Sequence, residues 1–198
     1  MHCVKQILIG IAAAAFAAGS LAAQGMSSNG EAFLQALREH QGSKALQLAE
    51  ADGSSVINHR GIDGSTALHI VTRNRNGYWL NFLLEKGADR NAGDREGDTP
   101  LIIAARSGYG EGVARLLMAR AQVDRANRLG ETALIAAVQQ RHAAIVSTLL
   151  KLGANPDKRD HTGYSARDHA ARDTRSKDML RLIETVKSRA AQIAPARP

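Results

Sequence analysis

Apolar residues along this chain come in short helical stretches, spaced i, i+3, i+4, which alternate with glycine-containing breaks. The alternation is periodic. A Gly-x-[Thr/Ser]-[Ala/Pro] word opens four successive helical stretches, at Gly64, Gly97, Gly130 and Gly163, and each word begins 33 residues after the one before it. Such a fixed period predicts one helix-turn-helix unit that is repeated along the chain and packs mainly on its own neighbours.

Local signals predict where the helices of each unit begin and end. Thr66 is placed to cap the start of one helix, and Pro100 takes the first position of the equivalent helix, where its missing N–H costs nothing. Gly87 and Gly153 stand where a helix ends in the left-handed region. Arg120 stands at the same register, so we expect a non-glycine residue there with positive φ, at a cost of roughly 1 kcal/mol unless the turn is rebuilt.

Two words, Thr99-Pro100-Leu101-Ile102 and Thr66-Ala67-Leu68-His69, resemble the T-P-L-H-x-A signature of ankyrin repeats. The resemblance implies an all-α ankyrin-repeat solenoid of about five helix-turn-helix repeats with short finger turns. Its inner helices and fingers would form a concave surface, and His69 would be a structural histidine that bonds across adjacent turns. We expect repeats at residues 31–62, 63–95, 96–128, 129–161 and 162–188.

The two ends of the array are expected to be atypical, because nothing stacks on their outer faces. The first repeat lacks the Gly-x-Thr word, and we expect a turn at Asp52-Gly53-Ser54-Ser55. In the last repeat, Arg167 stands where Leu68, Leu101 and Leu134 stand, which is typical of a polar cap. Trp79 falls on a core position of its helix by register, whereas Tyr78 does not.

The N-terminus has the three-part pattern of a secretory signal peptide over residues 1–23. A short basic segment precedes an apolar run of 12 residues (7–18), and small residues follow, with cleavage expected after Ala22 or Ala23. A retained membrane anchor is the alternative, but the run is shorter than the roughly 20 residues that a spanning helix needs. We therefore expect a periplasmic protein of a Gram-negative bacterium, with a flexible leader at 24–30 and a tail at 189–198.

Amino-acid composition limits the kinds of functional site and partner that the chain can have. Cys3 is the only cysteine and lies inside the expected signal, so the mature chain would have no disulfide, thiolate zinc site or cysteine nucleophile. The formal net charge of +7 favours an acidic partner. Export argues against nucleic acid as that partner. We expect a monomer without cofactor or stable membrane insertion.

No residue set predicts catalysis or metal binding. Residues 108–112 resemble a glycine-rich phosphate loop but fall between two helices of one repeat, where the required strand is missing. His161 with Asp157 and Asp160 lacks the spacing of a metal motif. Ser165, His169 and Asp173 have helical spacing but belong to the polar cap, so we expect no enzyme.

Residues 33 apart should stack into rows on a solenoid. The inner-helix row is Arg73, Arg106, Gln139 and Arg172, the finger row is Arg95, Arg128 and His161, and a neighbouring row is His59, Ala92, Arg125 and Lys158. By the geometry of the resembled family, the first two rows face the concavity. We therefore predict that an acidic protein binds this face through seven cations of the three rows: Arg73, Arg95, Arg106, Arg125, Arg128, Lys158 and Arg172.

Three alternatives to this prediction remain open. The basic face could simply be solvated. The chain could be an immunity-like inhibitor of an envelope toxin or hydrolase, which is still protein binding but with an enzyme as target. It could also bind an anionic envelope polymer, which predicts steep salt dependence and no protein partner.

Overall fold

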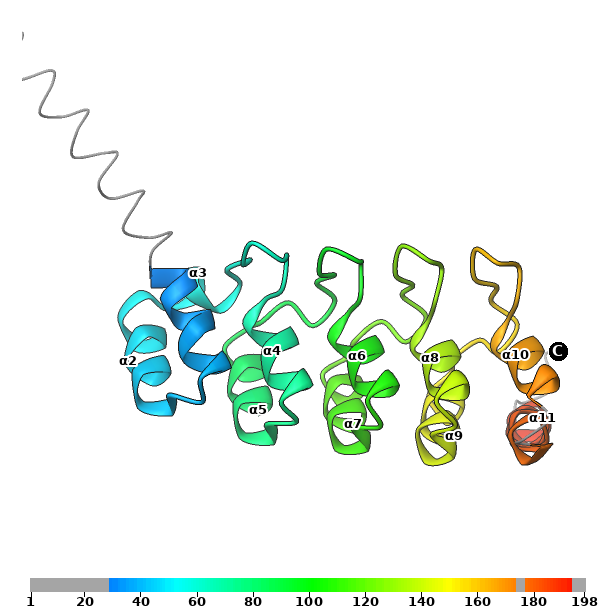
Figure 1. Ribbon diagram of the computed structural model, residues 1–198. Coiled ribbons are helices and arrows are strands. Elements are labelled where there is room, and N and C mark those ends of the chain that lie inside the picture. The colour runs from blue at the N-terminus through cyan, green and yellow to red at the C-terminus, as the bar shows by residue number, and fades with distance from the viewer. Residues whose placement is uncertain (1–28, 174–176, 194–198) are drawn as a thin grey trace, which may run out of the picture.

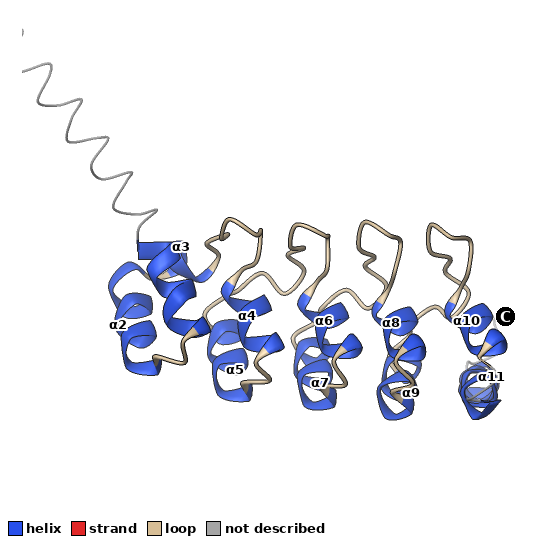
Figure 2. Cartoon of the chain, viewed as in Figure 1, coloured by secondary structure: helices blue, strands red, loops and turns tan. Residues whose placement is uncertain are grey.

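The computed structural model describes residues 29–173 and 177–193 of the chain. Helix pairs stand side by side in one row, and a finger-like loop projects between each pair and the next (Figure 1). Figure 2 shows that helices and loops make up the described ranges, in which no strand occurs. Two of the finger loops are each closed by an isolated antiparallel β-bridge, between Ala126 and Thr132 and between Arg159 and Ser165. The expected all-α solenoid is confirmed.

The helices follow the predicted pairs. The first repeat contains a helix over residues 29–38, then α2 (Gly42–Asp52) and the short α3 (Ser54–Ile57). The inner helices of the later repeats are α4 (Ala67–Arg73), α6 (Pro100–Arg106), α8 (Ala133–Gln139) and α10 (Ala166–Arg172). Their outer partners are α5 (Gly77–Glu85), α7 (Gly110–Met118), α9 (Ala143–Lys151) and α11 (Lys177–Ile193).

Three boundaries differ from the sequence expectation. The expected turn at 52–55 is reduced to Gly53, whose φ of 55° reverses the chain before α3 begins, and α3 buries Val56 and Ile57. Residues 29 and 30 are already helical, although the leader was expected to reach residue 30. At the other end, α11 extends to Ile193, into the expected tail. The expected signal peptide lies outside the described residues.

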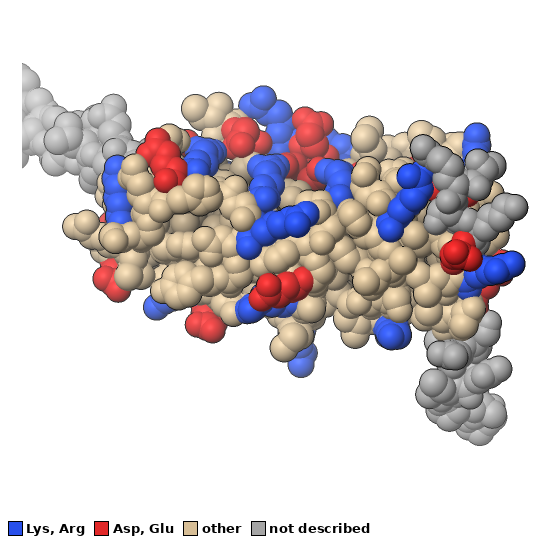
Figure 3. Space-filling view, turned by 60° about the horizontal axis from the view of Figure 1, so that its bottom comes forward, with Lys and Arg blue, Asp and Glu red and all other residues tan. Residues whose placement is uncertain are grey.

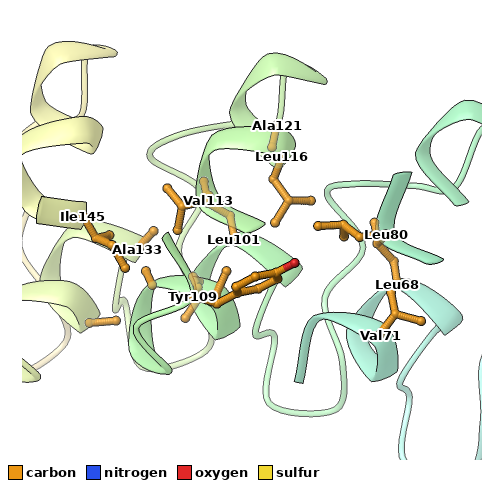
Figure 4. Packing of buried hydrophobic residues seen from close by; sticks show 14 of the residues in the cluster. Leu68, Val71, Leu80, Leu101, Tyr109, Val113, Leu116, Ala121, Ala133 and Ile145 are labelled. Carbon is orange, nitrogen blue, oxygen red and sulfur yellow. The ribbon is translucent and has the colours of Figure 1, made fainter. Parts of the chain in front are cut away.

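Small aliphatic side chains build a thin core that runs the length of the row. Leu68, Leu101 and Leu134 on successive inner helices are fully buried, as are Leu80 and Leu116 on the outer helices. Figure 4 shows these layers following one another from repeat to repeat. Trp79 is buried and Tyr78 is exposed, as their register predicts. Because each layer contacts only its neighbours, stability is approximately a sum over repeats and their interfaces.

The predicted helix ends are also confirmed. The Thr99 hydroxyl accepts the Ile102 N–H at 3.3 Å, and Pro100 occupies the first turn of α6. Gly87 has a φ of 81° and Arg120 a φ of 62° at the same register. The other described non-glycine residues with positive φ are His40, Arg75 and Arg141. All four follow a helix C-terminus, where the charge of the three arginine side chains interacts favourably with the helix dipole and offsets part of the backbone strain.

The polar C-terminal cap has a specific contact. Arg167 stands at the core-leucine register but is only half-buried, and its Nε donates to Asp157 Oδ1 at 2.8 Å. Its backbone N–H donates to the Pro156 carbonyl at 3.2 Å. The array therefore ends with a paired charge where an apolar side chain would otherwise face solvent.

Candidate protein-binding surface

The fingers are joined to each other by backbone hydrogen bonds near their tips. Arg95 N–H donates to the Asp63 carbonyl at 3.3 Å, Arg128 N–H to Glu96 at 3.0 Å, and His161 N–H to Leu129 at 2.9 Å. Each bond links a finger to the one before it. The four fingers thus form one continuous structure, which we call the finger ridge (residues 61–65, 94–98, 127–131 and 160–164).

Side-chain oxygens fix the conformation of three of these fingers from within. Asn127 Oδ1 accepts the N–H groups of Leu129 and Glu131, both at 2.9 Å. Asp94 and Asp160 do the same in their own fingers. Burial by itself would raise the pKa of Asp160, but hydrogen bonds from Thr162, His169 and Tyr164 lower it to about 2. The finger ridge is therefore preorganised, because its loops are already ordered before any partner arrives.

His69 connects the base of one finger to the next repeat. Its Nδ1 accepts the Thr66 N–H at 3.1 Å, so the proton resides on Nε2, which donates to the Asp98 carbonyl at 2.9 Å. The ring is fully buried, and this burial lowers its pKa. The structure confirms the predicted structural histidine.

The inner-helix row contains two arginines that lie in front of covered carboxylates. Arg73 Nη2 is 2.6 Å from Asp94 Oδ2, and the two side chains are 44% and 7% exposed. Arg106 pairs with both Asp98 and Glu131, which are likewise covered. Hydrogen bonds to Asp98 and Glu131 raise the pKa of Arg106. Burial by itself would raise the pKa of Asp98, but hydrogen bonds from Arg106 and Asn127 hold this pKa below its usual value.

These pairs change the charge expected of the row. Two guanidinium groups face three carboxylates (Asp94, Asp98 and Glu131), so this part of the row has no net positive charge. An open cleft of about 330 Å³ lies between the arginines, with Ile103 and Ser107 in its lining. The remaining cation of the row is Arg172, whose guanidinium carbon lies 4.3 Å from the centroid of the Tyr164 ring. Figure 3 shows Lys and Arg side chains crossing one face of the molecule with Asp and Glu beside several of them.

The finger row is less neutralised. Arg95 Nη2 donates to the Ile62 carbonyl at 2.8 Å and has no carboxylate partner in the described part of the chain. Arg128 and Arg125 are exposed and likewise form no ion pair within residues 29–173 and 177–193. Lys158 Nζ donates to the Asp124 carbonyl at 2.6 Å. Among the seven predicted cations, the exposed arginines without a carboxylate partner in the described ranges therefore lie on or beside the second and third fingers, namely Arg95, Arg125 and Arg128.

Sequence reasoning missed two parts of this surface. The carboxylates that pair with the inner-helix arginines were not recognised, although a spacing of eight residues relates Asp98 to Arg106 and Ser65 to Arg73, which are hydrogen-bonded. Ile62 and Leu129 at the finger tips are strongly exposed, which the apolar pattern alone does not indicate.

The residues weighed for other chemistry have structural partners. Residues 108–112 lie at the junction of α6 and α7. The Ser165 hydroxyl donates to Asp168 Oδ2, while His169 Nε2 contacts Asp160 Oδ2, so these side chains are not arranged as a nucleophile and its base. Among the described residues, no three His, Cys, Asp or Glu side chains are grouped to hold a metal ion. None of the helices in these ranges is apolar over a length sufficient to cross a membrane.

Stacked helix pairs with a preorganised finger ridge define a repeat protein whose surface is suited to binding other macromolecules. The sequence matches the family described as ankyrin repeats (3 copies) over residues 20–127 and 111–188, and the chain belongs to this family. None of the curated proteins matches it. Membership indicates a protein–protein interaction module of a kind that is typically non-catalytic.

Proposed function

We propose that this chain is an exported, non-catalytic binding module that holds an acidic protein against its finger ridge. The observation that carries the proposal is the set of exposed arginines without a carboxylate partner in the described ranges: Arg95, Arg125 and Arg128. They stand on or beside fingers whose backbone is fixed by hydrogen bonds. Cations held on an ordered surface attract an acidic partner and speed its encounter.

Arg73 and Arg106 have a second role in this proposal. Arg73 is exposed and Arg106 is half-buried, and covered carboxylates hold both guanidinium groups in place. Such groups offer outward N–H donors with little loss of side-chain entropy, so they contribute directional hydrogen bonds more than net charge. The partner would therefore lie across the fingers and reach the cleft at Ile103.

Export is the second half of the proposal, and it is supported by the signal-peptide pattern of residues 1–23. Expression of the full chain in a Gram-negative host, followed by fractionation, should place it in the periplasm. N-terminal sequencing of the purified protein should begin at Ala23 or Gln24. A cytoplasmic chain that still begins at Met1 would contradict the export proposal and leave the binding proposal standing.

The binding proposal is tested by crosslinked pull-down from an envelope extract of the native organism. Arg95→Glu/Arg128→Glu is compared with the matched control Lys44→Glu/Arg90→Glu, which makes the same change of charge at exposed cations away from the finger tips. We expect one acidic protein to be captured by the wild type and the control and lost from the finger variant. Capture that is equal in all three would refute the role of the finger row.

The same experiment distinguishes an enzyme target from an anionic polymer as the partner. A captured enzyme whose activity falls on binding would identify an immunity-like inhibitor, which is one form of the proposed function. Cell-wall fragments captured without any protein, and released steeply by salt, would instead favour the anionic polymer.

A further inference from the structure

The finger ridge carries exposed apolar side chains as well as cations. Three of the six large apolar residues that are exposed in the described chain lie on fingers, namely Ile62, Leu129 and Tyr164. Ile62 is 88% exposed and Leu129 is 68% exposed. Isolated exposed aliphatic residues are common on protein surfaces, so exposure alone carries no conclusion.

The position of these residues relative to the arginines is more informative. Leu129 directly follows Arg128, and Ile62 belongs to the row of Arg95 and Arg128, one finger earlier. Arg95 Nη2 holds the Ile62 carbonyl, so this guanidinium lies over the first finger close to the isoleucine. At the last finger, Arg172 is stacked on Tyr164. Each exposed apolar residue of the ridge is thus accompanied by an arginine.

The tips that carry the aliphatic residues are rigid. The Leu129 N–H donates to Asn127 Oδ1 at 2.9 Å, and its carbonyl accepts from His161 at 2.9 Å. Ile62 lies in a turn closed by the bond from Gly64 N–H to the Gly61 carbonyl at 2.8 Å. Exposed apolar groups on ordered backbone lose little conformational entropy when a partner covers them. The arginines and the tyrosine that accompany them on the ridge are residue types enriched at protein interfaces.

We infer that the partner segment is a polypeptide that presents apolar side chains together with carboxylates, with Ile62 and Leu129 as its apolar contacts. This inference rests on the proposed function, whose acidic partner it specifies further. A polyanionic carbohydrate offers charge without aliphatic groups and would leave both residues in water. The mixed surface therefore favours an acidic, amphipathic segment of a protein.

The test uses fluorescent peptides and the full mature chain, with anisotropy as the readout. One peptide is polyglutamate, a second has the same number of glutamates with leucines inserted at every third position, and heparin serves as a polyanion without apolar groups. We expect the leucine-containing peptide to bind about tenfold more tightly than polyglutamate. This preference should persist at raised salt, because apolar contacts are not screened.

The preference should be lost in Ile62→Ser/Leu129→Ser. It should be kept in the matched control Met118→Ser/Leu152→Ser, which removes two exposed apolar residues away from the fingers. Circular dichroism and thermal unfolding establish that both variants are folded. A preference that survives in the finger variant, or is lost in the control, would overturn the assignment to Ile62 and Leu129.

The remaining outcomes distinguish this inference from the proposal on which it rests. Equal binding of the two peptides would overturn the apolar contact and leave the acidic partner standing. Tight binding of heparin with no leucine preference would overturn the polypeptide inference in favour of a polymer. No binding of either peptide would overturn the acidic-partner proposal itself.

Discussion

The backbone N–H of His161 donates to the Leu129 carbonyl at 2.9 Å, and the same approach leaves no room for a side chain at Gly130. A Cβ on Gly130 would lie 2.8 Å from the His161 nitrogen. Nothing lies within 4 Å of the equivalent Cβ position at Gly163, which belongs to the last finger of the described residues. Both glycines have positive φ, 76° and 85°. The repeated glycine therefore meets two requirements inside the array and only one at its end.

Replacement of these two glycines by alanine separates the two requirements. Gly163→Ala should lower the free energy of unfolding by about 1 kcal/mol, the cost of a left-handed non-glycine residue. Gly130→Ala should lower it by at least about 1 kcal/mol more, because the Cβ must also displace the backbone of the fourth finger. Urea denaturation of both variants measures the difference, and equal losses would show that finger stacking does not require the glycine.

Arg106 should contribute more to stability than the arginines of the finger row. Arg106→Met would leave Asp98 and Glu131 covered without their charged partner, so we expect a loss of about 2 kcal/mol. The control Arg128→Met, at an exposed arginine without an ion pair in the described ranges, should change stability by less than about 0.5 kcal/mol. Chemical denaturation checks both values. A similar, small effect of the two changes would mean that the Arg106 pairs are energetically neutral.

Acid should destabilise the fold in two steps. Burial lowers the pKa of His69 in the folded chain, whereas the same imidazole in the unfolded chain binds a proton near about pH 6.5. The unfolded state therefore gains a proton first on acidification. The free energy of unfolding keeps its full value above that pH and falls below it. The lowered pKa values of Asp98 and Asp160 add stability above about pH 4, which is lost as these groups bind protons.

Urea unfolding at neutral pH, about pH 5 and about pH 3 measures this decline. Asp160→Asn should reduce the change between the two acidic conditions, because asparagine accepts hydrogen bonds through its side-chain oxygen but does not titrate. The step near His69 should be unchanged in this variant. Stability that rises on acidification would contradict both assignments.

Tyr109 has a buried hydroxyl that finds no hydrogen-bond partner in the described part of the chain. Burial raises the pKa of this hydroxyl. Its oxygen lies against the neighbouring repeat, since a Cβ added to Gly77 would be 3.3 Å from it. Tyr109→Phe removes an unsatisfied polar atom without changing the ring packing, so the free energy of unfolding should stay the same or rise by up to about 1 kcal/mol. A clear loss of stability in thermal or urea unfolding would indicate a bound water as the missing partner.

Much of the local structure was predictable because it depends on neighbouring residues. Thr99-Pro100 specifies a helix start through its own hydroxyl and fixed φ. The constant period also placed Arg120 at a left-handed position and Trp79 in the core, and both predictions are confirmed. The extra helix α3 was missed because burial of Val56 and Ile57 in the tertiary structure outweighs the turn propensity of Gly53-Ser54-Ser55.

The candidate surface was predictable as a set of positions but not as a distribution of charge. The 33-residue period placed the arginines in register, because similar repeats that stack on one another bring residues one period apart to equivalent positions. Whether each arginine is neutralised depends on distances between side chains from different repeats, such as Arg106 and Glu131, which are 25 residues apart. No local pattern contains those distances.

The amino-acid sequence by itself therefore determined the repeat, the helix ends and the family to which the chain belongs, because each depends on short-range chemistry repeated at a constant interval. The tertiary structure decided where net charge and exposed apolar area remain. Packing of one repeat on the next covers Asp94, Asp98 and Glu131 behind Arg73 and Arg106, while the finger tips keep Ile62 and Leu129 in solvent. Pairing and burial are properties of neighbours in space, and only the stacked array brings those neighbours together.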